Sequence, residues 1–291
     1  MDRRKALYLI ASAGASVLFD VNSSFAVESD LEIKVREKVL KSSTLSPFLL
    51  KQMKSLKPYK ENNISLVYEI FRDVSESSIG YGSINFDKDA RIMDMGIDDF
   101  KFTIDIGLFF TTSFLNIFGS RGKYSRISDL ENIRTYLELD PNFEWKKYRE
   151  GIPLRGNPET TQREYVKERN KVTMNGEDFA ILRGRIPLHN PLSIAFEILN
   201  GKKPNSFDMV ANAKHSPKIE LDYGQLNGLD DFLVVGVDFK NPIIKNFKKI
   251  HAICYNNIPI SGYIKMQHSD FDIIRGQISD IKVDGKSILK G

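Results

Sequence analysis

Cysteine is nearly absent from this chain of 291 residues, since Cys254 is the only one. A single cysteine excludes an intramolecular disulfide, so the fold must be stabilised by packing. It also excludes zinc and redox sites built on paired cysteines. We expect Cys254 to be buried as a small apolar side chain.

Long hydrophobic runs and a charge excess of one sign are lacking as well. Beyond the first 26 residues, the longest nearly uncharged run covers 106–118, which is shorter than the roughly 20 residues that span a bilayer. The 42 basic and 38 acidic residues are interspersed, whereas a nucleic-acid binder needs a concentrated basic surface. We therefore predict neither a membrane span in the body of the protein nor a nucleic-acid partner.

Motifs of catalysis and cofactor binding are also missing. The sequence contains no His-Glu-x-x-His and no Gly-x-Ser-x-Gly, and Gly80-Tyr81-Gly82 is not followed by the third glycine of a dinucleotide site. Asp280 stands where a phosphate loop ending in 284–287 requires its first glycine. We predict no metal and no cofactor, and a binding protein rather than an enzyme.

A hydrolase that acts on envelope lipid or glycan without a recognisable motif remains the alternative. This hypothesis requires a histidine within hydrogen-bond reach of a carboxylate or a serine, inside a cleft. The candidates are His189, His215, His251 and His268.

The beginning of the chain has the three parts of a secretion signal. Basic residues that include Arg3 and Arg4 precede an apolar run over 6–19, and the small residues Ser24 and Ala26 follow it. We predict a signal peptide over 1–26, cleavage after Ala26 and a periplasmic protein. The Arg3-Arg4 pair also leaves the twin-arginine export route open.

The remaining residues alternate in a way that predicts a mainly β protein. Apolar spacings of three and four indicate an N-terminal helical segment over 27–60, and a period of two begins at Ile64. Strands are expected over 64–70, 79–86, 100–110, 124–128, 133–139, 145–149, 165–174, 179–182, 207–211, 219–223, 232–239, 247–255, 258–266 and 271–283, with turns at Asn175-Gly176 and Asn256-Asn257. So many strands with short connections over 61–291 favour one large curved antiparallel sheet, or an open or closed barrel. The loop 151–161 is a possible sub-boundary, and Asn190 with Pro191 predicts the start of one later helix.

Two strand faces are candidates for ligand binding. Residues 100–110 alternate so that one face is wholly apolar and lines either a packed core or a cavity. A strand over 165–174 would place basic side chains on one face, which would suit an anionic headgroup or a glycan, or simply face solvent. The candidate residues are Phe100, Phe102, Ile104, Ile106, Leu108 and Phe110 on the first face, and Arg163, Lys167 and Arg169, with Lys171, on the second.

Short motifs between Ile64 and Ile281 resemble a family of exported bacterial proteins of unknown function. They are Leu66-x-Tyr68, Ile79-Gly80-Tyr81-Gly82, Asn190-Pro191-Leu192-Ser193 with Phe196, Leu199 and Gly201, and the segment from Cys254 to Ile260. The order of elements is also similar to that of outer-membrane lipoprotein carriers, whose unclosed barrels hold acyl chains. These resemblances imply a non-catalytic protein that binds an apolar or amphipathic envelope molecule or serves as an assembly partner. The oligomeric state stays open.

Overall fold

In this computed structural model the described part of the chain comprises residues 30–42, 47–56, 62–98, 133–151, 163–169, 171–181, 188–209, 218–226, 229–238, 247–266 and 273–288. The helices of these residues are α2 (Asp30–Ser42), α3 (Pro47–Ser55) and α5 (Pro191–Leu199). The strands are β1 (Ile64–Arg72), β2 (Ser78–Asp87), β3 (Ile92–Asp98), β4 (Ile133–Leu139), β5 (Trp145–Gly151), β6 (Arg163–Glu168), β7 (Lys171–Met174), β8 (Glu177–Ile181), β9 (Leu188–His189), β10 (Ser206–Met209), β11 (Lys218–Glu220), β12 (Asp222–Leu226), β13 (Leu229–Asp238), β14 (Phe247–Tyr255), β15 (Ile258–Met266), β16 (Ile273–Val283) and β17 (Lys286–Ser287).

One large antiparallel sheet dominates the fold, as the sequence predicts. Its fourteen strands follow the order β12-β13-β14-β15-β16-β1-β2-β3-β4-β5-β6-β7-β8, with β17 paired to β16. Because β12 and β8 are not paired with each other, the sheet is open rather than a closed barrel. A smaller sheet has the order β11-β10-β9 and contains a parallel pair, β9 with β10.

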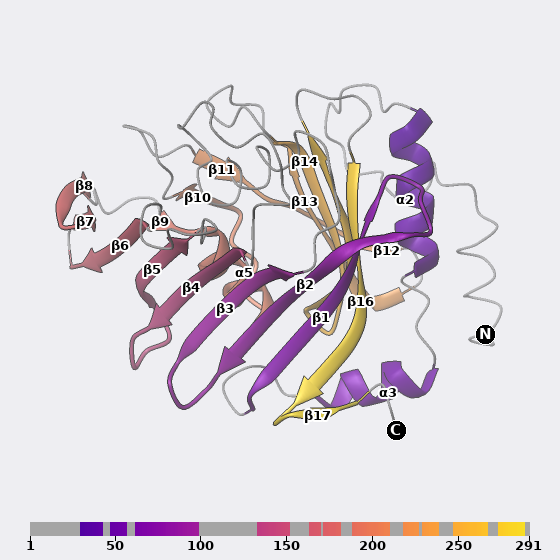
Figure 1. Ribbon diagram of the computed structural model, residues 1–291, viewed down its shortest axis with the longest axis horizontal. Helices are drawn as coiled ribbons and strands as arrows, with labels where there is room; N and C mark the ends of the chain where they lie inside the picture. The colour runs from indigo at the N-terminus through magenta and orange to yellow at the C-terminus, as the bar shows by residue number, and fades with distance from the viewer. Residues whose placement is uncertain are drawn as a thin grey trace.

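The order of strands places the first strand of the described chain beside one of the last. β1 lies between β16 and β2, and nine residues of β1, from Ile64 to Arg72, pair with β16. The sheet is strongly curved, so that β1 to β5 form one wall and β13 to β16 the other (Figure 1). We call the face that contacts α5 the inner face, and the face that contacts α2 the outer face.

Helix α5 packs between the two walls on the inner face. Phe196 contacts Phe86 of β2, with ring centroids 5.4 Å apart, and Ile198 packs on the cluster of Leu233, Val235 and Cys254. The buried Cys254 confirms the expectation from the sequence. The helix begins as predicted, because the side chains of Asn190 and Ser193 form a capping box with Pro191 at the first position.

Helix α2 covers the outer face of β15 and β16, and its apolar residues Val35 and Val39 are buried there. Both N-terminal helices fall within the predicted helical segment 27–60. None of the helices in the described residues reaches the length and hydrophobicity that a bilayer crossing requires.

Two segments were predicted as single strands, but each is divided into two strands in the structure. The strand expected over 165–174 is a hairpin of β6 and β7 that turns at Arg169, and the strand expected over 219–223 is divided between β11 and β12. Strand β3 was not predicted at all. The loop 151–161 does not separate two sheets, because β5 and β6 on either side of it are neighbours in the same sheet. The hairpin turn at Asn175-Gly176 is confirmed by positive φ angles of 51° and 86°.

Candidate functional site

The inner face changes from packed core to open cavity along the direction of the strands. In β1, Leu66 is fully buried in the main core, Tyr68 packs at the margin of this core, and Ile70 lies beyond it. The cross-strand partners follow the same order, since Leu66 pairs with Ile281, Tyr68 with Ile278 and Ile70 with Gly276. The main core therefore ends at Tyr68.

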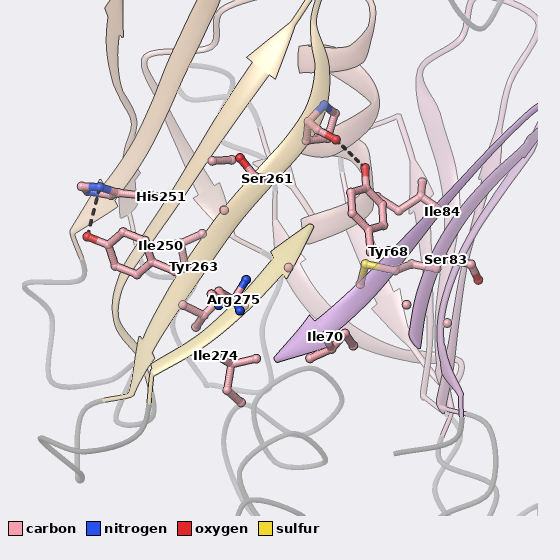
Figure 2. A pocket seen from close by; sticks show the side chains of 18 residues that line it. Tyr68, Ile70, Ser83, Ile84, Ile250, His251, Ser261, Tyr263, Ile274 and Arg275 are labelled. Atoms are coloured by element: carbon pink, nitrogen blue, oxygen red, sulfur yellow. Dashed lines mark hydrogen bonds between the residues drawn. The ribbon is translucent and has the colours of Figure 1, made fainter. Parts of the chain in front are cut away.

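Beyond this margin, the two walls border a cavity of about 240 Å³ that is open to the outside. Figure 2 shows Ile250 and Ile274 on one side of the hollow and Ile70 and Ile84 on the other. The inner-face residues that line it are Tyr68 and Ile70 of β1, Gly82 and Ile84 of β2, Met95 of β3, Ile250 and Ala252 of β14, Pro259, Gly262 and Ile264 of β15, and Ile274 and Gly276 of β16. Aliphatic side chains and glycines thus make most of the surface.

Glycines keep this part of the inner face open. A Cβ atom at Gly276 would meet nothing within 4 Å, so this position faces empty space. At its cross-strand partner Gly262, a Cβ would lie only 2.5 Å from the backbone oxygen of His251. Gly276 therefore leaves room for a ligand, whereas Gly262 allows β14 and β15 to approach each other.

Tyr68 closes the cavity on the side of the core. Its hydroxyl donates a hydrogen bond of 2.8 Å to the carbonyl oxygen of Pro259, which joins β1 to β15 across the inner face (Figure 2). The residue paired with Tyr68 in β2 is Gly82, and a Cβ there would lie 3.5 Å from Cδ1 of Ile70, so Ile70 covers this position. The Tyr68 ring, tied to β15 by its hydroxyl, forms the inner end of the cavity.

A buried charged cluster lies directly behind the cavity wall, on the outer face. Glu32 of α2 accepts hydrogen bonds from Lys249 of β14 at 2.7 Å and from Lys265 of β15 at 2.6 Å. The side chains of Glu32, Lys249 and Lys265 are only 2%, 5% and 3% exposed. Lys249 precedes the cavity residue Ile250 and Lys265 follows Ile264, so one carboxylate links the two strands that form this wall.

The protonation states in this cluster follow from burial and charge. Burial by itself would raise the pKa of Glu32, but the hydrogen bonds and charges of Lys249 and Lys265 outweigh it and hold that pKa below its ordinary value. Burial, followed by the charge of Lys249, lowers the pKa of His251 to about 4. His251 is therefore neutral at pH 7, and its Nδ1 lies 3.3 Å from the hydroxyl of Tyr263.

The apolar face predicted as a ligand site, Phe100 to Phe110, lies outside the described residues. The basic face was predicted on one continuous strand, whereas β6 and β7 are separate strands, so only Arg163 and Lys167 of the predicted set share a face of β6. Lys167 pairs with Val172 and Lys171 pairs with Glu168, so the two lysines lie on opposite faces. Arg169 stands in the turn between them, and Arg163 begins β6.

The lysines of this region are neutralised by neighbouring carboxylates. Lys167 lies 3.5 Å from Glu144 and over the ring of Trp145, and Lys171 lies 3.5 Å from Asp178. These exposed pairs contribute little to stability, but they leave less positive charge available to an anionic ligand.

One histidine comes close to a serine, as the hydrolase hypothesis requires. Nδ1 of His189 lies 3.2 Å from Oγ of Ser193. This hydroxyl also accepts from the backbone N–H of Asn190 and donates to its carbonyl oxygen, at 2.9 and 3.0 Å, so it serves the cap of α5. Ser193 is 3% exposed, and its burial withholds it from a substrate. His215 and His268 lie outside the described residues.

Other features of the described residues add no reactive group. Burial raises the pKa of Cys254 to about 12, so its thiol is protonated and inert at neutral pH. Among the described residues, no three His, Cys, Asp or Glu side chains gather as a metal site would require. A second hollow of about 360 Å³ lies by α3, but Asn256 there caps α3 and Lys54 pairs with Asp231 at 3.1 Å.

Sequence reasoning assigned none of the inner-face cavity residues to a ligand site, although Tyr68 and Gly82 belong to the motifs of the resemblance. Ile250, Ile264 and Ile274 were recognised as strand residues, but nothing in their spacing shows which faces of distant strands meet. The one usable signal is that Gly262 and Gly276 fall inside predicted strands, where glycine often marks a bulge or a close approach.

No protein-family model and no curated protein matches this sequence. Among solved structures, the chain is similar to a DUF1089 family protein from Pseudomonas aeruginosa over 65% of this chain and 85% of that one, with 7% identity and a TM-score of 0.28. It is also similar to a DUF1329 family protein from Desulfovibrio piger over 86% and 93% of the two chains, with 8% identity and a TM-score of 0.29. Both relatives are distant and belong to families of unknown function.

Proposed function

We propose that this protein is a non-catalytic periplasmic protein that binds the apolar part of an amphipathic envelope molecule in its inner-face cavity. The observation that carries the proposal is the open space at Gly276, between walls whose inner side chains are aliphatic. The hydroxyl of Tyr68, which reaches across this space, already donates to the carbonyl oxygen of Pro259.

The chemistry of the lining selects for hydrocarbon. A sugar or a peptide placed between Ile70, Ile264 and Ile274 would lose its hydrogen bonds to water without replacement, and each buried unsatisfied group costs about 1–3 kcal/mol. A hydrocarbon chain gains about 0.8 kcal/mol for each buried methylene group. The volume of about 240 Å³ is below the roughly 300–1,000 Å³ of sites that enclose a whole drug-sized ligand, so it suits one part of a larger molecule.

Native mass spectrometry of protein purified from the envelope of a bacterial host tests this proposal. The wild type should carry an added mass that organic solvent extracts, and Gly276→Leu should lose it because leucine fills the open space. Gly276→Ala is the matched control, since one methyl group leaves most of the cavity free. A wild type without any added mass would contradict ligand binding. A wild type that retains only a co-purifying protein would also contradict it and would favour a role in assembly.

Export is tested separately by the mass of the mature chain. We expect cleavage after Ala26, so that the purified protein begins at Val27 and is recovered in the periplasmic fraction. Replacement of Arg3 and Arg4 by lysine should block export if the twin-arginine route is used and should leave it unchanged if the general route is used. A full-length protein in the cytoplasm of the host would refute the export part of the proposal.

A further inference from the structure

Tyr68 occupies the boundary between the core and the cavity, and this position gives it a role beyond packing. The residues on its core side are tightly buried, since Leu66 and its cross-strand partner Ile281 are both 0% exposed. On its other side, Gly276 faces open space. A chain that enters the cavity and advances along the strands therefore meets the ring of Tyr68 before it meets any core residue.

The ring is held in place at its hydroxyl end, which donates a hydrogen bond of 2.8 Å to the carbonyl oxygen of Pro259 (Figure 2). Beside it, Ile70 covers the cross-strand partner Gly82, since a Cβ there would lie 3.5 Å from Cδ1 of Ile70. Tyr68 also packs against the margin of the main core, together with Ile84 and Met95. A side chain supported in this way cannot yield to a ligand without breaking a hydrogen bond and opening the core.

We propose that Tyr68 is the end stop of the cavity and sets the length of the aliphatic chain that the protein accepts. This inference rests on the proposed function, because an end stop matters only if a chain enters. If a methylene group takes up about the volume of a water molecule, roughly 30 Å³, the cavity of about 240 Å³ holds a segment of roughly eight carbons. The methyl end of the ligand points towards Tyr68, because no described polar group lies free at that end to receive a headgroup.

A series of straight-chain saturated fatty acids of increasing length tests the end stop. Each fatty acid displaces a fluorescent apolar probe from purified mature protein, below the concentration at which micelles form. In the wild type, affinity should rise about fourfold with each methylene group and then stop rising at a defined length, because further carbons remain outside. The length at which the rise stops is the measured quantity.

Substitutions at Tyr68 should move this break point in a predictable way. Tyr68→Ala removes the ring, so the break should shift to longer chains by several carbons. Tyr68→Phe keeps the ring but removes the bond to Pro259, so the break should stay where it is. If Tyr68→Ala does not fold, Gly82→Ala provides the opposite test. Its Cβ would lie 3.5 Å from Cδ1 of Ile70, which is an ordinary contact. The added methyl group narrows the cavity and should move the break point to shorter chains.

The outcomes separate the two proposals. If wild-type affinity does not depend on chain length, the proposed hydrocarbon site is wrong. If affinity rises with length but the break is missing, or stays fixed in both Tyr68→Ala and Gly82→Ala, the site stands and the end stop is refuted.

Discussion

Gly262 and Gly276 are cross-strand partners on β15 and β16, yet alanine should change the stability of the protein in opposite directions at the two positions. At Gly262 the new Cβ would lie 2.5 Å from the backbone oxygen of His251 and 3.1 Å from the Cα of Ala252. Non-bonded carbon atoms prefer about 3.5–4.0 Å, and backbone atoms of a paired strand cannot move aside freely.

The size of the difference follows from these contacts. Overpacking of this kind costs about 1–3 kcal/mol, so Gly262→Ala should destabilise the protein by that order. The Cβ of Gly276→Ala would meet nothing within 4 Å, and the backbone there has no positive φ. Alanine lowers the conformational entropy of the unfolded chain, so this variant should be more stable than the wild type by about 0.4–1 kcal/mol. The two variants should thus differ by about 1.4–4 kcal/mol.

Equilibrium unfolding in urea measures this difference from the midpoints of the two variants, provided that the slopes match that of the wild type. Thermal unfolding should agree, since 1 kcal/mol corresponds to a Tm shift of about 2–4 °C in a protein of this size. Equal destabilisation by both alanines would mean that Gly276 does not face open space, and the argument for a cavity would then fail.

Two further predictions concern the buried cluster behind the cavity. Glu32→Gln leaves the ammonium groups of Lys249 and Lys265 buried without a carboxylate, and should destabilise the protein by about 3–5 kcal/mol in urea unfolding. The control Glu138→Gln breaks one exposed ion pair and should cost under about 1 kcal/mol. Similar losses of stability in the two variants would refute the importance of burial. The pKa of His251 is 6.5 in the unfolded chain and about 4 in the folded one, so between these pH values only the unfolded chain binds a proton at this residue. The free energy of unfolding should therefore fall by about 3 kcal/mol as the pH is lowered from 6.5 to 4. His251→Gln should remove this part of the pH dependence, and a variant that keeps it would assign the effect to other groups.

Much of the fold could be predicted from local patterns. Strands β14 and β15 were predicted at their observed bounds, because β-branched and aromatic residues alternate there and Asn256-Asn257 supplies the turn. Strand β3 was missed because Asp94, Gly96 and Asp98 belong to residue types that are depleted in strands. The turn at Arg169 was missed because the alternation of basic residues was continued through it, although the next residue, Asn170, is a favoured turn former.

The site could not be predicted, because it depends on register and not on local sequence. Gly276 becomes the floor of a cavity only because β16 lies beside β1, whose nearest residues are some 200 positions away in the chain. The pairing of Glu32 with Lys249 and Lys265 has the same cause, since α2 and β14 to β15 are distant in sequence. The sequence alone would not predict that these charged side chains are buried, because charged side chains rarely are.

The pairing of β1 with β16 also has a consequence for the order in which the protein folds. These strands form the centre of the sheet, but one is the first strand of the described chain and the other nearly the last. Contacts of such high sequence separation form slowly, and none of them can form before β16 has been synthesised. A chain that passes through a membrane pore from its N-terminus would release β1 and β2 early and leave the other edge of β1 unpaired until β16 follows. Its two long walls would meet last, and a chain exported in this way would need protection from aggregation in the interval between release and completion.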